Sequence, residues 1–76
     1  MKLEKINSYR KLDKIVVNIV EHKENPVMAS EVNQELHNRY DPCQLYISNK
    51  SLGARLARNP NIRVIPGKYN RYAARR

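Results

Sequence analysis

The side chains best suited to chemistry in this sequence are the cations of its C-terminal half. Residues 43–76 hold eight basic side chains and no carboxylate, whereas residues 1–42 hold seven of each sign, so the whole net charge of +8 lies on 43–76. Solubility alone would favour mixed signs across the surface. The asymmetry therefore predicts a polyanionic partner, above all nucleic acid. The cations are Lys50, Arg55, Arg58, Arg63, Lys68, Arg71, Arg75 and Arg76.

The residues that could serve catalysis or metal binding are not spaced for either. His22, His37 and Cys43 fall on different segments, without the spacing of a metal site. Asp13 and Glu35 have no evident partner for acid–base chemistry, and the carboxylates are scattered on faces expected to be solvated. The sequence has no nucleophile motif and no glycine-rich phosphate loop. We therefore expect a protein that is not an enzyme and uses no cofactor or metal.

Length and composition indicate one small domain. A core built from 76 residues supplies roughly 3–5 kcal/mol, and the single cysteine excludes an intrachain disulfide and fits a reducing compartment. The first residues alternate in charge without an apolar stretch, so we expect no signal peptide. No apolar run is long enough to span a bilayer. These features predict a cytoplasmic protein, nucleoid-associated if its source is bacterial, archaeal or viral.

The elements that must position the cations start with two predicted helices. Apolar residues at three- and four-residue spacing predict a helix over 8–22, capped by Asn7 or Ser8 and ended before Pro26. A second helix is expected over 29–38, with an alternative start about two residues later if Ser30 is the cap. The first helix is expected to bury Tyr9, Leu12, Ile15, Val16, Ile19 and Val20, and the second Ala29, Val32 and Leu36, with Glu31, Asn33, Gln34 and Glu35 facing water.

The third helix follows a break at residues 40–43 and an irregular segment through residue 47. Ser48 is the expected cap of a helix over 49–58, in which Leu52 and Leu56 share the inner face. Gly53 beside them would let another helix approach closely.

A basic hairpin ends the chain. Residues 62–65 are rich in β-branched side chains and predict a strand, and Pro66-Gly67 predicts a turn. Residues 69–73 are expected to form the second strand, so the hairpin spans 62–73 and 74–76 is a basic tail. Tyr69 and Tyr72 are expected to pack against the hairpin, as aromatic residues do in short strands.

This order of elements resembles the winged helix-turn-helix family. Val27–Val32 is similar to the entry of the family's second helix, Ser48–Arg58 to its recognition helix, and Ile62–Tyr72 to its wing. The resemblance covers roughly residues 8–72. It implies a single α+β, mostly helical domain over 1–76, a three-helix bundle followed by a two-stranded β-hairpin wing. It also implies that the third helix enters the major groove, while the wing lies on the backbone or in the minor groove.

The helical wheel of the third helix agrees with a reading role. It places Lys50, Ser51, Ala54 and Arg58 outward and Asn49 and Arg55 on the flanks. Lysine and arginine donate to guanine, asparagine pairs with adenine, and a small alanine permits close approach. In the wing, arginine suits a narrow minor groove and lysine suits phosphate. An ordinary solvated face and edge protection by lysine are the alternatives. The candidate nucleic-acid-binding residues are Asn49, Lys50, Ser51, Ala54, Arg55, Arg58, Arg63, Lys68, Asn70, Arg71, Arg75 and Arg76.

The expected partner is double-stranded DNA, in transcription regulation or as an accessory factor in replication or recombination. Two alternatives stay open, a protein-interaction adaptor and an RNA-binding or ribosome-associated protein, because function does not follow from fold. The chain is expected to be a monomer or a weak homodimer without membrane contact. Its neutral N-terminal half is expected to serve as scaffold.

Overall fold

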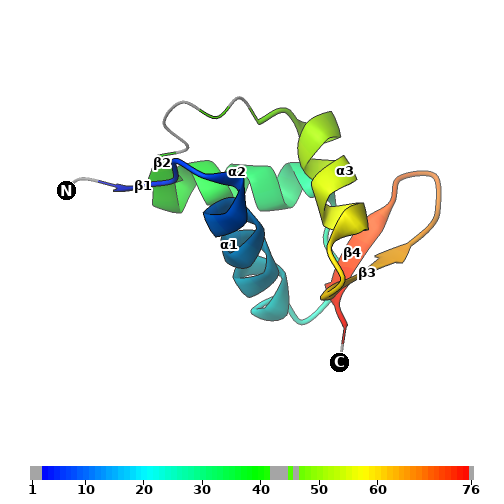
Figure 1. Cartoon of the computed structure of the whole chain (residues 1–76). Coiled ribbons are helices and arrows are strands. Elements are labelled where there is room, and N and C mark those ends of the chain that lie inside the picture. Colours follow the sequence, from blue (N-terminus) through cyan, green and yellow to red (C-terminus); the bar gives the residue numbers. More distant parts are fainter. Residues whose placement is uncertain (1–2, 42–44, 46, 76) are drawn as a thin grey trace.

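Three helices and two small sheets make up the chain. The computed structural model describes residues 3–41, 45 and 47–75. The fold is α+β and about half helical, with the two sheets at opposite ends of the helices (Figure 1). In chain order the elements are β1 (Glu4–Lys5), α1 (Tyr9–Glu21), α2 (Ala29–Arg39), β2 (Tyr40–Asp41), α3 (Asn49–Arg58), β3 (Ile62–Ile65) and β4 (Arg71–Ala74).

Helix α1 begins at the predicted cap. The Ser8 hydroxyl accepts the backbone N–H of Lys11 at 3.2 Å, which satisfies one of the free donors of the first turn. The expected apolar face is buried at Leu12, Val16, Ile19 and Val20 and partly buried at Ile15. Tyr9 corrects the prediction, because it is 45% exposed. It is the first residue of α1, and its ring lies beside a cation of α3 instead of entering the core.

Helix α2 begins at Ala29, so the later start with Ser30 as the cap is wrong. Met28 holds the cap position with no side-chain acceptor. Its backbone N–H instead donates to Glu31 Oε1 at 3.4 Å, the half of a capping box that a methionine permits. Val32 is buried on the inner face, as expected.

Glu35 of α2 was expected to face water without a partner, but it is half-buried between two cations. Its carboxylate pairs with Lys23, just after α1, and with Arg39 Nη2 at 3.0 Å. The hydrogen bond from Lys23 is the main cause that lowers the pKa of Glu35 below its ordinary value of 4.5. Burial opposes the shift, and the charges of Lys23, Arg39 and His22 add to it. The Lys23–Glu35 pair therefore holds the segment after α1 against α2, while the Arg39–Glu35 pair lies within α2.

Helix α3 occupies the predicted range, and its first turn is closed by two serines. The Ser48 hydroxyl accepts the backbone N–H of Ser51 at 3.1 Å, and the Ser51 hydroxyl accepts the backbone N–H of Ser48 at 3.0 Å. Leu52 and Leu56 are fully buried, as the wheel predicts.

Gly53 marks a close approach on one flank of α3. A Cβ at this position would lie 3.1 Å from the Tyr72 hydroxyl oxygen and 3.6 Å from Cβ of Ala29. The helix that approaches Gly53 is α2, at its first residue Ala29, but the Tyr72 hydroxyl of β4 comes nearer still.

Strands β3 and β4 form the expected antiparallel hairpin, with Ile62 opposite Ala74 and Ile65 opposite Arg71. The second strand begins at Arg71 and not at residue 69, and it extends one residue further than predicted. Tyr72 is 5% exposed and packs in the core as expected, whereas Tyr69 is 65% exposed, which corrects the prediction for that ring. Its place in the 66–70 loop, outside the strand, explains the difference.

Backbone hydrogen bonds attach the hairpin to the connection between α1 and α2. The Val27 N–H donates to the Tyr72 carbonyl at 2.9 Å, and the Tyr72 N–H donates to the Val27 carbonyl at 2.7 Å. An isolated two-stranded hairpin is marginal in water. This bridge, together with burial of Ile62, therefore fixes the hairpin beside α3.

A second, parallel strand pair lies at the other end of the molecule. Glu4 pairs with Tyr40 and Lys5 with Asp41, and the next backbone N–H, that of Ile6, donates to the Asp41 carbonyl at 2.7 Å. The predicted break at residues 40–43 is thus a strand in its first half, while Pro42 and Cys43 lie outside the described residues.

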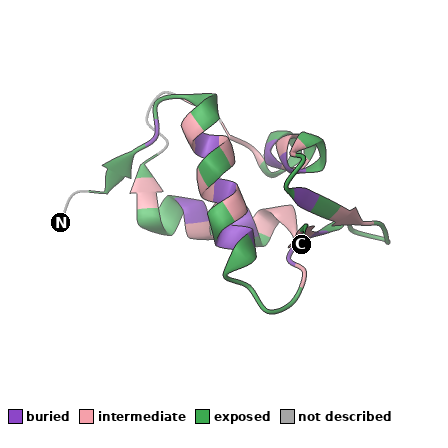
Figure 2. Cartoon of the chain, turned by 60° about the horizontal axis from the view of Figure 1, so that its bottom comes forward, coloured by how far each residue is buried: buried purple, intermediate pink, exposed green. Residues whose placement is uncertain are grey.

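The core lies between the three helices and the inner face of the hairpin, and Figure 2 marks the buried positions along these elements in purple. In the described part of the chain, no helix is long and apolar enough to cross a membrane. The buried residues are Ile6, Leu12, Val16, Ile19, Val20, Val27, Val32, Leu36, Leu52, Leu56, Ile62 and Tyr72.

Candidate nucleic-acid interface

The outer face of α3 is built as the helical wheel predicts. Burial of Leu52 and Leu56 orients the helix, and Lys50, Ala54 and Arg58 are consequently exposed on its opposite side. Within the described residues neither cation forms an ion pair. The face is therefore a convex surface with free cations around a small central residue, a shape that a groove of nucleic acid can receive.

Two predicted polar residues of α3 are exposed but already engaged. The Asn49 Oδ1 accepts a hydrogen bond from Asn33 Nδ2 at 2.8 Å. Asn33 of α2 was predicted to face water, but it is half-buried beside the start of α3. The Ser51 hydroxyl donates to the Ser48 carbonyl at 3.1 Å while it closes the first turn. Both side chains help to fix the start of α3, which leaves Lys50 and Arg58 as its free polar groups.

Arg55, one of the predicted binding residues, is engaged within the fold. Its Nε and Nη2 donate to the two carboxylate oxygens of Asp13 on α1, each at 3.0 Å, and its guanidinium carbon lies 4.3 Å from the centroid of the Tyr9 ring. A bidentate pair with an aromatic neighbour commits the guanidinium to holding α3 on α1. Asp13, for which the sequence suggested no partner, is thereby neutralised.

The hairpin places its side chains on two faces. Residues directly opposite each other in an antiparallel pair share a face. Arg63 of β3 lies opposite Ala73, and Arg71 of β4 lies opposite Ile65. Because residues 63 and 65 are two positions apart on β3, they share a face, and both arginines therefore stand on the outer face. Both are exposed, as are Lys68, Asn70 and Arg75. Arg76 lies outside the described residues. The alternation therefore turns the wing cations outward while Tyr72 turns inward.

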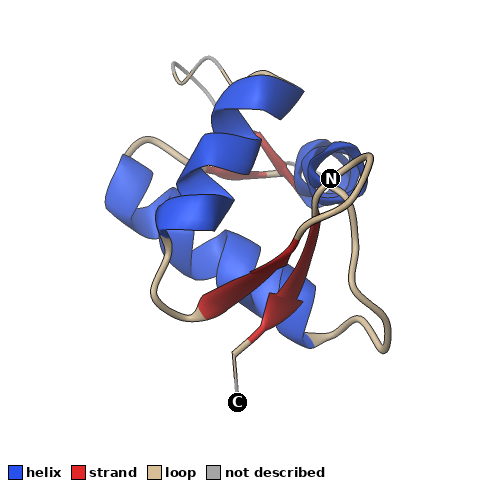
Figure 3. Cartoon of the chain, turned by 90° about the vertical axis from the view of Figure 1, so that its right-hand side faces the viewer, coloured by secondary structure: helices blue, strands red, loops and turns tan. Residues whose placement is uncertain are grey.

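One groove brings helix and hairpin residues together. Asn49, Lys50, Lys68 and Asn70 line a groove of about 410 Å³ between the start of α2, α3 and the 66–70 loop. The loop lies in front of the start of α2 when the hairpin is viewed from outside (Figure 3). None of the described residues that line this groove is acidic. The exposed Tyr69 ring also lines it, with the Lys68 ammonium 5.9 Å from the ring centroid. Lys50 and Lys68, distant in sequence, thus form one basic surface.

Two other cations of the hairpin and its C-terminal end do not line that groove. Arg63 and Arg75 line a different groove of about 610 Å³, together with residues of the connection between α1 and α2. Glu24 of this connection and Glu21, the last residue of α1, are part of the lining. This side of the hairpin therefore carries mixed charge, unlike the side that faces α3.

Sequence reasoning missed two cations of α1. Arg10 and Lys14 line a groove of about 720 Å³ with Arg55 and Arg58 of α3. The signal was their i, i+4 spacing, which puts them on one face of the helix. The net charge of residues 1–42 gave no indication of them, because the seven carboxylates of that half bring its sum to zero.

Among the residues that the structure describes, no three of the His, Cys, Asp and Glu side chains are grouped to hold a metal ion. What the arrangement offers is a set of free cations for binding an anionic polymer. No protein-family model matches the chain, and neither the search of curated proteins nor the search of solved structures gave a match.

Proposed function

We propose that this chain is a winged-helix domain that binds double-stranded DNA, with α3 in the major groove and the hairpin on the backbone or in the minor groove. The observation that carries the proposal is the acid-free surface shared by α3 and the 66–70 loop, on which Lys50 and Lys68 line one groove. The major groove is wide enough to admit an α-helix. A convex helix with a basic hairpin beside it suits that shape.

The proposed roles follow from position. Lys50 and Arg58 flank Ala54 on the exposed face of α3, where long donors can reach guanine O6 and N7 while the small residue lets the helix approach. Lys68 and Arg71 stand on the hairpin, where they contact phosphate and hold the register without reading sequence. We infer a binding role without catalysis, in transcription regulation or as a replication or recombination accessory.

Selection from random duplexes at near-physiological salt, followed by variant binding, tests the proposal. Lys68→Gln should weaken the selected and the random duplex alike. Arg58→Gln should reduce the difference between them by about 1–3 kcal/mol, the discrimination lost with one base contact. Lys5→Gln, an exposed lysine of β1 at the end of the molecule away from the hairpin, should leave both affinities unchanged.

Three outcomes would overturn the proposal. The first is that the wild-type chain retains no duplex in the selection. The second is that structured RNA displaces duplex DNA at much lower concentration, which would make RNA the partner. The third is that the chain captures a stoichiometric protein in a complex that survives nuclease, which would favour an adaptor role.

A further inference from the structure

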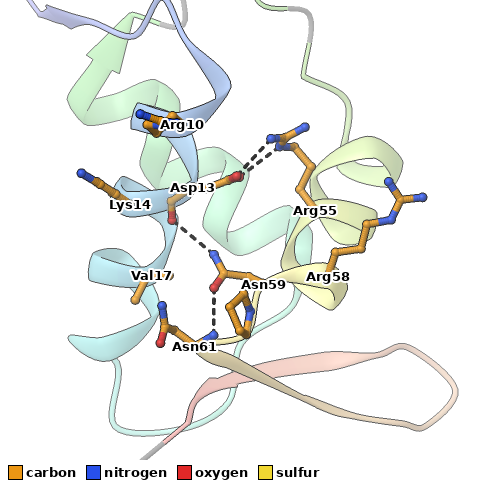
Figure 4. A pocket seen from close by; sticks show the side chains of 9 residues that line it. Arg10, Asp13, Lys14, Val17, Arg55, Arg58, Asn59 and Asn61 are labelled. Carbon is orange, nitrogen blue, oxygen red and sulfur yellow. Dashed lines mark hydrogen bonds and ion pairs between the residues drawn. The ribbon is translucent and has the colours of Figure 1, made fainter.

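The groove between α1 and α3 has cations on both of its sides. Arg10 and Lys14 project from α1, and Arg58 projects from the last turn of α3, with the Asp13–Arg55 pair between them (Figure 4). Arg10, Lys14 and Arg58 are exposed, and none of the three has an ion-pair partner among the described residues. Because Arg55 already neutralises Asp13, the groove keeps an excess of three positive charges.

The bottom of the groove is held in a fixed shape. The Asn59 amide nitrogen donates to the Asp13 carbonyl at 3.5 Å, and its amide oxygen accepts the Asn61 backbone N–H at 2.9 Å. These bonds and the bidentate Asp13–Arg55 pair join the end of α3 to the middle of α1. The two cationic sides therefore keep their relative positions without a ligand.

The helix dipoles explain the position of Arg58 but not that of Arg10. Arg58 lies at the C-terminal end of α3, where the helix dipole favours a cation. Arg10 is the second residue of α1, where the dipole favours an anion, and the first turn of α1 contains no acid. The placement of Arg10 is thus unfavourable in the isolated domain and becomes favourable when an anion occupies the groove.

The position of the groove indicates the polymer that it fits. Gly53 and Arg55 are two residues apart, about 200° around the helix, and they face the hairpin and α1 respectively. The hairpin and the α1–α3 groove therefore lie on opposite flanks of α3. A helix in the major groove has a sugar–phosphate backbone on each side. If the hairpin meets one backbone, α1 meets the other.

We propose that the α1–α3 groove is a second nucleic-acid contact, in which Arg10 and Lys14 hold the phosphates of the strand opposite the one that the hairpin grips. This inference rests on the proposed function and deepens it, since it assigns the role of backbone contact to residues of the N-terminal half. Arg58 lies at the boundary between this contact and the reading face of α3.

The test is the salt dependence of duplex binding by Arg10→Gln/Lys14→Gln. Each lost phosphate contact reduces the slope of log K against log salt by about 0.9, so the double variant should show a slope shallower by about 1.8. Lys5→Gln/Lys11→Gln is the control, because it removes the same number of positive charges from the same half outside the groove, although Lys11 is paired with Glu4, and it should keep the wild-type slope. Glutamine is a good helix former, and circular dichroism checks that both variants fold.

Each result decides between the two proposals. A double variant with the wild-type slope, measured on a wild-type chain that does bind with salt dependence, overturns the groove contact alone. A wild-type chain without salt-dependent duplex binding overturns the proposed function and the groove contact together. Equal losses of slope in the double variant and the control would also overturn the groove contact, because they would reflect net charge and not position.

Discussion

At the scale of single residues, the structure divides the cations into those that hold the fold and those that remain free. Arg55 and Arg58 are three positions apart on α3, and sequence reasoning assigned both to binding. Arg55 turns to α1 and makes a bidentate pair with Asp13, whereas Arg58 stays exposed. A helical wheel gives the direction of a side chain but does not show which carboxylate of another helix lies there. The different roles of Arg55 and Arg58 could therefore not be predicted from the sequence.

The division predicts opposite effects of two similar changes. Arg55→Gln should lower the free energy of unfolding by about 0.5–1 kcal/mol, the range for a partly exposed ion pair, and leave the salt slope of DNA binding unchanged. Arg58→Gln should cost only a few tenths of a kcal/mol, through loss of the favourable interaction with the C-terminal end of the helix dipole, and should weaken specific binding. Urea denaturation and fluorescence anisotropy measure the two quantities. A shallower salt slope for Arg55→Gln would show that the guanidinium leaves Asp13 to contact phosphate.

At the scale of elements, the helices could be predicted because their information is local. The apolar spacing of α1 and the caps Ser8 and Ser48 lie within the segments that they define. Strands β1 and β2 are two residues each and exist only through pairing over a long sequence separation, so no local pattern indicated them. Similarly, Tyr69 and Tyr72 look alike in sequence, and only the register that starts β4 at Arg71 separates the exposed ring from the buried one.

The packing of the hairpin on α3 depends on Gly53. Gly53→Val would place a branched side chain where even a Cβ is 3.1 Å from the hydroxyl of the buried Tyr72. We expect a loss of about 1–3 kcal/mol in the free energy of unfolding, the cost of overpacking a core. Ala57→Val, at an exposed position of the same helix, is the control and should cost at most a few tenths of a kcal/mol. Equal stability of the two variants in urea denaturation would contradict the close approach seen at Gly53.

At the scale of the whole molecule, the charge distribution is three-dimensional and differs from its distribution along the sequence. The sum over residues 1–42 is zero, yet Arg10 and Lys14 of that half lie beside the basic end of α3. Conversely, Arg63 and Arg75 of the basic half lie near Glu21 and Glu24. The polyanion-binding prediction rests on net charge, but only the fold identifies which cations share a surface.

The central claim is that this surface binds duplex DNA through its phosphates, and the salt dependence of wild-type binding tests it most directly. Four free cations are the proposed phosphate contacts, namely Lys68 and Arg71 of the hairpin with Arg10 and Lys14 of α1, while Lys50 and Arg58 are the proposed base contacts. If all four contact phosphate, log K for a duplex should fall against log salt with a slope of roughly −3.6. A slope near zero, with or without measurable binding, would contradict the account.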